Sequence, residues 1–145
     1  MRTLIALVAV VSAAVLAPNA MSERQADRGT VTVHSSTYGQ ILFDGKGFVL
    51  YAFTKDPRSR SACYGACAVA WPPYLVTKAP KAGPGIKASL LGTTRRSNGK
   101  LQVTYAGRPL YYYVHDDSPY EIRCQNISEF GGLWLVARAN GTLVK

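Results

Sequence analysis

The stretch Ile41-Leu-Phe-Asp-Gly-Lys-Gly-Phe-Val-Leu-Tyr-Ala-Phe-Thr-Lys-Asp56 is repeated in pattern by Leu101-Gln-Val-Thr-Tyr-Ala-Gly-Arg-Pro-Leu-Tyr-Tyr-Tyr-Val-His-Asp116. Aligned without a gap, the two stretches place Gly47 on Gly107, Leu50 on Leu110, Tyr51 on Tyr111, Phe53 on Tyr113 and Asp56 on Asp116. Self-similarity at a spacing of about 60 residues indicates a duplicated supersecondary unit. Two copies are fewer than a solenoid needs, so we expect them to pack together as one domain.

Both copies carry the sequence signals of a β-hairpin. In the first copy, the apolar segments 41–43 and 48–53 are separated by the turn sequence Asp44-Gly-Lys-Gly47. In the second copy, the segments 101–105 and 109–114 flank a glycine-containing turn. Each copy is therefore predicted to form two short antiparallel strands.

Outside the hairpins, the sequence predicts one opening strand, one short helix and one surface connection. Thr30–Ser35 alternates and is rich in β-branched residues, which favours a strand. The alanine-rich segment 61–70 favours a helix that Ser61 caps and Pro72-Pro73 terminates. The Lys-, Ala-, Pro- and Gly-rich segment 77–85 is typical of a connection between two halves.

The predicted fold is mainly β, with two pseudo-repeated β-hairpin units packed as one domain over residues 30–145. The repeats are expected at about 37–76 and 97–137, with a short helix near 61–70. A chain of 145 residues with 48% hydrophobic content suits one domain. It is too short for a multidomain enzyme and too apolar for a disordered chain.

The N-terminus has the features of a secretory signal peptide. A basic start at Arg2 precedes an apolar run from Leu4 to Ala17 that only Ser12 interrupts, and this run is shorter than the about 20 residues of a membrane span. We expect residues 1–20 to be the signal peptide and the protein to be secreted or otherwise extracytoplasmic. No cysteine directly follows the apolar run, so a lipid anchor at this terminus is not expected.

The motif of two aromatic residues and an aspartate has two interpretations. Tyr51 and Phe53 are two residues apart, so they project from the same face of a strand, and Asp56 falls at or beyond the strand end. In the first interpretation the rings pack in the core and the carboxylate fixes a turn, so that asparagine could replace it at little cost. In the second, the rings form a ligand platform with the aspartate as a polar anchor. The residues concerned in the two copies are Tyr51, Phe53, Asp56, Trp71, Tyr111, Tyr113, Asp116 and Trp134.

These motifs together resemble a bacterial family described as a secreted repeat of unknown function, or as predicted lipoproteins with a Tyr-x-(Phe/Trp/Tyr)-x-x-Asp motif. The segments that carry the resemblance are Leu50–Asp56, Cys63–Ala68, Trp71-Pro-Pro73, Tyr105–Tyr111 and Phe130–Trp134. The resemblance implies tandem repeats in exported proteins, with no established activity. The chain departs from the family in two ways, because it lacks the acylated cysteine and because Cys124 stands where a glycine is expected.

The three cysteines of the chain predict one disulfide and one remaining thiol. Cys63 and Cys67 are four residues apart, and in an exported protein a disulfide is the default interpretation. A metal site or a redox pair is the alternative, although the only histidines are His34 and His115 and the Cys-x-x-Cys spacing is absent. Cys124 is then a free thiol, an intermolecular bridge or an inert buried thiol.

The formal net charge of +9 predicts attraction to anionic envelope polymers or to a membrane surface. A merely solubilising surface is the alternative, and no nucleic-acid recognition motif accompanies the charge. The basic clusters are Lys55, Arg58 and Arg60; Lys78, Lys81 and Lys87; and Arg95, Arg96 and Lys100. We expect all of these to lie in surface loops or turns.

The sequence contains no recognised catalytic motif. A Gly-x-Ser-x-Gly nucleophile turn, a phosphate-binding loop and a His-Glu-x-x-His helix are all missing. His115 and Asp116 are of the right types for hydrolysis, but adjacency on a strand end does not form a relay. We therefore expect a non-enzymatic, envelope-associated binding or structural module that needs no cofactor or metal. The alternative is a redox or metal-handling envelope protein that uses Cys63 and Cys67.

Overall fold

The computed structural model describes residues 29–145, so the expected signal peptide lies outside the described residues. The elements in chain order are β1 (Thr30–Ser36), β2 (Gly39–Asp44), β3 (Tyr51–Phe53), α2 (Ala66–Ala70), β4 (Leu75–Val76), β5 (Lys81–Ala82), the 3₁₀ turn η1 (Ala88–Leu90), β6 (Leu91–Arg95), β7 (Leu101–Tyr105), β8 (Arg108–Tyr111), β9 (Ile127–Glu129) and β10 (Gly132–Val136). The prediction of a mainly β fold with one short helix is confirmed.

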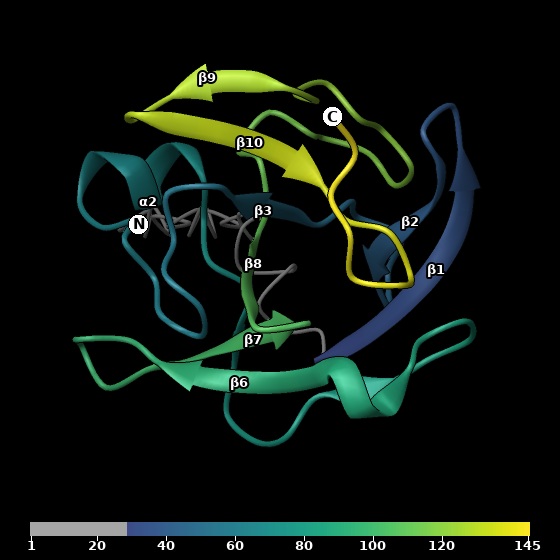
Figure 1. Cartoon of the computed structure of the whole chain (residues 1–145), viewed down its shortest axis with the longest axis horizontal. Coiled ribbons are helices and arrows are strands. Elements are labelled where there is room, and N and C mark those ends of the chain that lie inside the picture. Colours follow the sequence, from purple (N-terminus) through teal and green to yellow (C-terminus); the bar gives the residue numbers. More distant parts are fainter. Residues whose placement is uncertain (1–28) are drawn as a thin grey trace, which may run out of the picture.

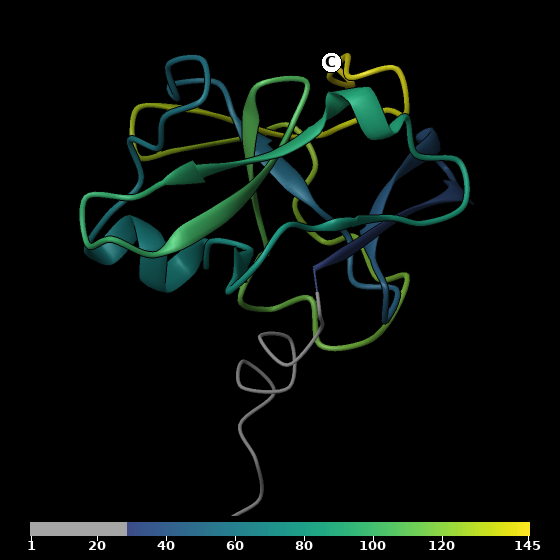
Figure 2. The ribbon, with the colours of Figure 1, turned by 90° about the horizontal axis from the view of Figure 1, so that it is seen from below.

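The strands form two sheets. The smaller has the order β2-β1-β5, and the larger has the order β4-β7-β8-β3-β10-β9, with β6 also paired to β7. Figure 1 shows β9 and β10 along one side of the molecule, β6 and β7 along the opposite side, and β1 with β2 on a third. Strands β3 and β8 lie between these groups, and Figure 2 shows the β6–β7 hairpin crossing one face.

The central strand pair joins the two sequence repeats. β3 of the first copy and β8 of the second are antiparallel, and their register places Tyr51 opposite Tyr111. Equivalent residues of the two copies therefore face each other, as they do about a two-fold axis. The two copies pack into one structure through this pair, as the sequence predicts.

The core consists of two apolar clusters on the two sides of the central strands. Alternation along a strand sends successive side chains to opposite faces. Tyr51 and Tyr111 accordingly belong to one cluster, and the neighbouring Leu50 and Leu110 belong to the other. Both tryptophans of the repeats, Trp71 and Trp134, lie in the first cluster, which makes it the aromatic side of the core.

The helix begins later than the sequence predicts. Helix α2 covers only Ala66–Ala70, because Gly65 has a φ of 56° and a ψ of −129°, a conformation that no α-helix contains. Ser61 is not its cap, since its hydroxyl contacts Tyr111 instead. The end of the helix before Pro72-Pro73 agrees with the prediction.

Other differences arise where pairing partners are distant in sequence. The expected surface connection 77–85 contains β5, which runs parallel to β1. The segment 48–53 divides: Val49 bridges back to Phe43, whereas Tyr51–Phe53 crosses to β8 and β10. Strands β6 and β9 were not predicted from the sequence, and they pair with β7 and β10. In the described part of the chain, none of the helices is both long and apolar enough to cross a membrane.

Candidate functional site: the paired repeat motif

Each copy of the repeat supplies the hydrogen-bond partner that the other copy needs. The Tyr51 hydroxyl donates to Asp116 Oδ2 at 2.8 Å, and the Tyr111 hydroxyl donates to Asp56 Oδ2 at 2.7 Å. The exchange follows from the register, because the two tyrosines are directly opposed on β3 and β8. The motif is therefore completed between copies and never within one.

The second oxygen of each carboxylate closes a loop of its own copy. Asp56 Oδ1 accepts the Ala62 backbone N–H at 2.7 Å, and Asp116 Oδ1 accepts the Arg123 N–H at 3.0 Å. These donors lie six and seven residues along the chain, which is farther than the tight turns predicted from the sequence. The carboxylates thus fix loops and, in addition, join the two halves.

The remaining motif rings form a stack in which the copies alternate. Phe53 stacks on Trp134 with 4.2 Å between centroids and 7° between planes. Trp134 stacks on Trp71 at 4.1 Å and 4°, and Tyr113 lies tilted on the far face of Trp71 at 4.7 Å and 39°. Each aromatic residue at the end of the stack therefore covers the tryptophan of the other copy.

The tyrosines close this stack from the side. Tyr51 meets Trp71 edge-on at 5.2 Å, and Tyr111 meets Trp134 edge-on at 5.1 Å. All four of these rings are completely buried. The tryptophans have no free face on which a ligand could lie, which favours the packing interpretation of the motif over a ligand platform.

Burial and the facing carboxylates make the two central tyrosines hard to ionise. Burial, followed by the charge of Asp116, raises the pKa of Tyr51, and burial with the charge of Asp56 does the same to the pKa of Tyr111. The pKa of Asp56 is also raised, chiefly by burial. A hydrogen bond to Cys124 is the largest cause that raises the pKa of Tyr113 to about 12.

The raised tyrosine pKa values predict a loss of stability in alkali. Each tyrosine ionises near pH 10 in the unfolded chain and only above that in the folded protein, so its contribution is complete below about pH 10 and is lost as the pH rises. The free energy of unfolding should fall by up to about 1.4 kcal/mol per pH unit for each such tyrosine. Urea denaturation between about pH 9 and pH 11 measures this slope, and Tyr51→Phe should reduce it.

Tyr120→Phe is the matched control for that experiment. Tyr120 is 58% exposed, so its variant shows the effect on the slope of removing a tyrosine hydroxyl outside the core. Equal slopes in the wild type and in Tyr51→Phe would contradict the assignment.

One buried cation beside the motif was not predicted from the sequence. Arg96 was expected in a surface cluster, but it is only 4% exposed. Its guanidinium donates to Ser61 Oγ at 2.8 Å, to Gln102 Oε1 at 2.7 Å and to the Cys63 carbonyl at 2.6 Å. Ser61 in turn contacts the Tyr111 hydroxyl at 2.7 Å. Arg96 is therefore connected through Ser61 to the Tyr111–Asp56 hydrogen bond. Nothing in the sequence distinguishes Arg96 from Arg95 and Lys100, the other basic residues of the same cluster.

The predicted disulfide between Cys63 and Cys67 is present, and both residues are buried. Cys124 is the free cysteine of the described residues and is half-buried, and burial is the main cause that raises its pKa. Within residues 29–145, no group of three or more His, Cys, Asp or Glu side chains is arranged to hold a metal ion.

Removal of this disulfide should have a moderate effect. The closed loop is short, so Cys63→Ser with Cys67→Ser should lower the free energy of unfolding by about 2 kcal/mol at most. Chemical denaturation measures the loss, and Cys124→Ser is the control that should leave the stability nearly unchanged. Thiol titration of the unfolded, unreduced chain should find the single thiol of Cys124. Three reactive thiols would contradict the disulfide.

The fold and its paired motif define a β domain built from two interlocked copies of one unit. The family model described as "secreted repeat of unknown function" matches residues 32–74 and 92–138. The chain belongs to this family, and the two matches correspond to the two copies that exchange hydrogen bonds. No match to a curated protein or to a solved structure was found.

Proposed function

We propose that this protein is a non-enzymatic module at the cell envelope, where its basic surface binds anionic polymers. The observation that carries the proposal is the internal use of the repeat motif. The tyrosine hydroxyls and the aspartate carboxylates bond to one another across the copies, and the tryptophans stack in the core. This internal use supports an architectural role for the motif, and we place binding on the surface around it as part of the proposal.

The charge distribution supports an anionic partner. The whole chain has a formal net charge of +9. Basic residues such as Lys55, Lys78 and Lys87 are exposed, and for a protein that belongs to a secreted family the polyanions in reach are those of the envelope. Long-range attraction of this kind raises the local concentration of the partner and the rate of encounter.

Burial of the disulfide favours this proposal over the redox alternative. Cys63 is completely buried and Cys67 is 7% exposed. Thiol–disulfide exchange requires an attacking thiolate to reach a sulfur atom, and redox-active cysteines are accordingly accessible. A structural role in holding the loop before α2 accounts for the pair more simply.

The proposal is tested by binding of the mature protein to an immobilised polyanion and to vesicles with and without acidic lipid. We expect retention that falls steeply as the salt concentration rises from about 50 mM to about 500 mM, because screening weakens contacts between exposed charges. The vesicles distinguish an acidic membrane surface from a polymer. Absence of retention at low salt, or retention that is independent of salt, would overturn the proposal.

A further inference from the structure

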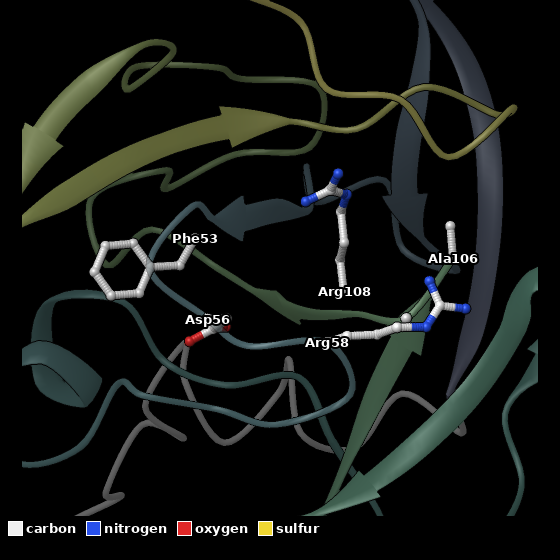
Figure 3. A pocket seen from close by; sticks show the side chains of 6 residues that line it. Phe53, Asp56, Arg58, Ala106 and Arg108 are labelled. Carbon is white, nitrogen blue, oxygen red and sulfur yellow. The ribbon is translucent and has the colours of Figure 1, made fainter.

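A pocket with a volume of about 140 Å³ opens beside the hairpin turn of the second copy. It lies between that turn and the loop that follows β3, and so at the junction of the two copies. Its lining residues are Phe53, Asp56, Arg58, Ala106, Gly107 and Arg108. Figure 3 shows Arg58 beside the turn at Ala106, and Arg108 between that turn and Phe53.

The two arginines are the available polar groups of this pocket. Within residues 29–145, neither the Arg58 nor the Arg108 side chain makes a hydrogen bond or an ion pair, and both residues are exposed. Asp56 is different, because each of its oxygens already accepts a hydrogen bond, from Ala62 and from Tyr111. The pocket therefore offers guanidinium donors and has a net charge of one positive unit.

The first copy has an equivalent place beside its own hairpin turn, at Gly47, where side chains cover the turn. The backbone N–H of Ser59 donates to the Gly107 carbonyl at 2.7 Å, and that of Tyr120 donates to the Gly47 carbonyl at 2.8 Å. Ser59 and Tyr120 also share a positive φ, 54° and 64°. The two residues are therefore structural equivalents, each following the aspartate of its own copy and contacting the hairpin turn of the other.

At the Gly47 turn, aromatic and apolar groups occupy the space. The Tyr120 ring lies so close to Gly47 that a Cβ there would be 3.0 Å from it. The same ring packs on His34 at 5.1 Å and on Phe43 at 5.6 Å between centroids. His34 and Phe43 also contact each other at 5.5 Å between centroids, so a cluster of three aromatic rings covers this turn.

At the Gly107 turn, polar residues stand where the other copy has apolar ones. Position 59 holds a serine where the equivalent position 120 holds a tyrosine, so no ring covers the Gly107 turn from that position. Arg108 follows Gly107 where Phe48 follows Gly47. Arg58 lies over Gly107, where a Cβ would be only 3.0 Å from the Arg58 Cγ. The copies thus diverged at one equivalent place, toward a filled apolar contact in one half and an open cationic pocket in the other.

We propose that the Arg58–Arg108 pocket binds a singly charged oxyanion group of the envelope polymer. Guanidinium groups pair with carboxylate and phosphate oxygens through two parallel hydrogen bonds, which suits a planar or tetrahedral oxyanion. The volume is below the range of drug-sized sites, so it fits one group of a polymer and not a whole cofactor. The net positive charge matches a monoanion, a chemistry shared by carboxylates and phosphodiesters. The inference rests on the anionic partner of the proposed function and assigns its specific contact point.

The test is an NMR titration of the mature protein with dimethyl phosphate and, separately, with acetate. We expect saturable shifts of the Arg58 and Arg108 Nε–H signals and of the Gly107 amide. In Arg58→Gln with Arg108→Gln, affinity for the better anion should fall by about tenfold or more. Lys78→Gln with Lys87→Gln removes the same charge from exposed residues outside the pocket and should change the affinity by no more than about twofold.

The two anions also identify the source of the group. Tighter binding of dimethyl phosphate assigns a phosphodiester polymer, and tighter binding of acetate assigns a carboxylate polymer. An unchanged backbone spectrum shows that the exposed arginine substitutions leave the fold intact.

Equal losses of anion affinity in the arginine and lysine variants would contradict oxyanion binding by the pocket. So would a titration of the wild type in which the Arg58 Nε–H, Arg108 Nε–H and Gly107 amide signals do not shift. Polyanion retention of the arginine variant distinguishes the two proposals. If the protein is retained on the polyanion but the NMR signals of the pocket do not shift, oxyanion binding by the pocket is contradicted and the proposed general function stands. If the wild type is not retained at all, the proposed function fails, whereas saturable shifts would still place an oxyanion site in the pocket.

Discussion

Replacing Trp134 with alanine is expected to lower the free energy of unfolding by about 3–5 kcal/mol, the range for large buried aromatic residues. Trp134 is completely buried at the centre of the aromatic stack, with Phe53 on one face, Trp71 on the other and Tyr111 at its edge. Its removal leaves a cavity that the neighbouring rings, held by both copies, cannot fill. Urea denaturation followed by far-UV circular dichroism measures the loss.

Phenylalanine substitutions of the two tryptophans provide the matched comparison. The Trp134 indole N–H has no hydrogen-bond partner in the described structure, whereas the Trp71 indole N–H donates to Glu129 Oε2 at 2.8 Å. Trp71→Phe should therefore cost about 1.5–3 kcal/mol more than Trp134→Phe, since only the former loses a hydrogen bond to a charged group. Equal costs would show that the Glu129 contact contributes nothing.

Replacing Asp116 with alanine should destabilise the protein by about 2–6 kcal/mol. Asp116 is 2% exposed and accepts from the buried Tyr51 hydroxyl and from the Arg123 N–H. Loss of the carboxylate leaves these donors unsatisfied, at about 1–3 kcal/mol each. Asparagine should also be costly, because its NH₂ group faces a donor; a purely turn-fixing aspartate would tolerate it. Denaturant midpoints of the two variants decide between these roles.

The equivalent change at Asp56 is the internal control for this prediction. Asp56 is half-buried and its hydrogen bond from the Ala62 N–H is exposed, whereas the bond from the Arg123 N–H to Asp116 is partly buried, so at Asp56 water can replace more of what alanine removes. Asp56→Ala should cost about 1–2 kcal/mol. A loss at Asp56 as large as that at Asp116 would mean that burial does not set the strength of these pairs.

The local parts of the fold could be predicted from the sequence, because turn residues and alternation act over short distances. The opening strand at Thr30 and the hairpin of the second copy at Leu101–Tyr105 are where these signals place them. The start of α2 was predicted too early. The alanines of segment 61–70 favour a helix from residue 61, but the backbone conformation of Gly65 prevents the helix from beginning before Ala66. Strand β6 was missed although it contains the β-branched Thr93 and Thr94, because its place in the sheet depends on pairing with β7.

The candidate site shows the same limit more sharply. Repeat alignment singles out Tyr51, Asp56, Tyr111 and Asp116, but it cannot say which tyrosine meets which carboxylate. That depends on the register of β3 with β8, which is a tertiary property. The burial of Arg96 was hidden for a related reason, since its partners Ser61 and Gln102 lie on separate elements.

The exchange of tyrosine and aspartate partners bears on the origin of the molecule. Neither tyrosine bonds to the aspartate of its own copy, so a protein with one copy of the unit would lack both tyrosine–aspartate hydrogen bonds and keep only the backbone donors of each carboxylate. Two such chains related by a two-fold axis would satisfy both pairs at once, in the isologous manner of a symmetric dimer. Duplication and fusion of such a unit would produce the exchange seen in the present chain, in which a single polypeptide holds the two halves together.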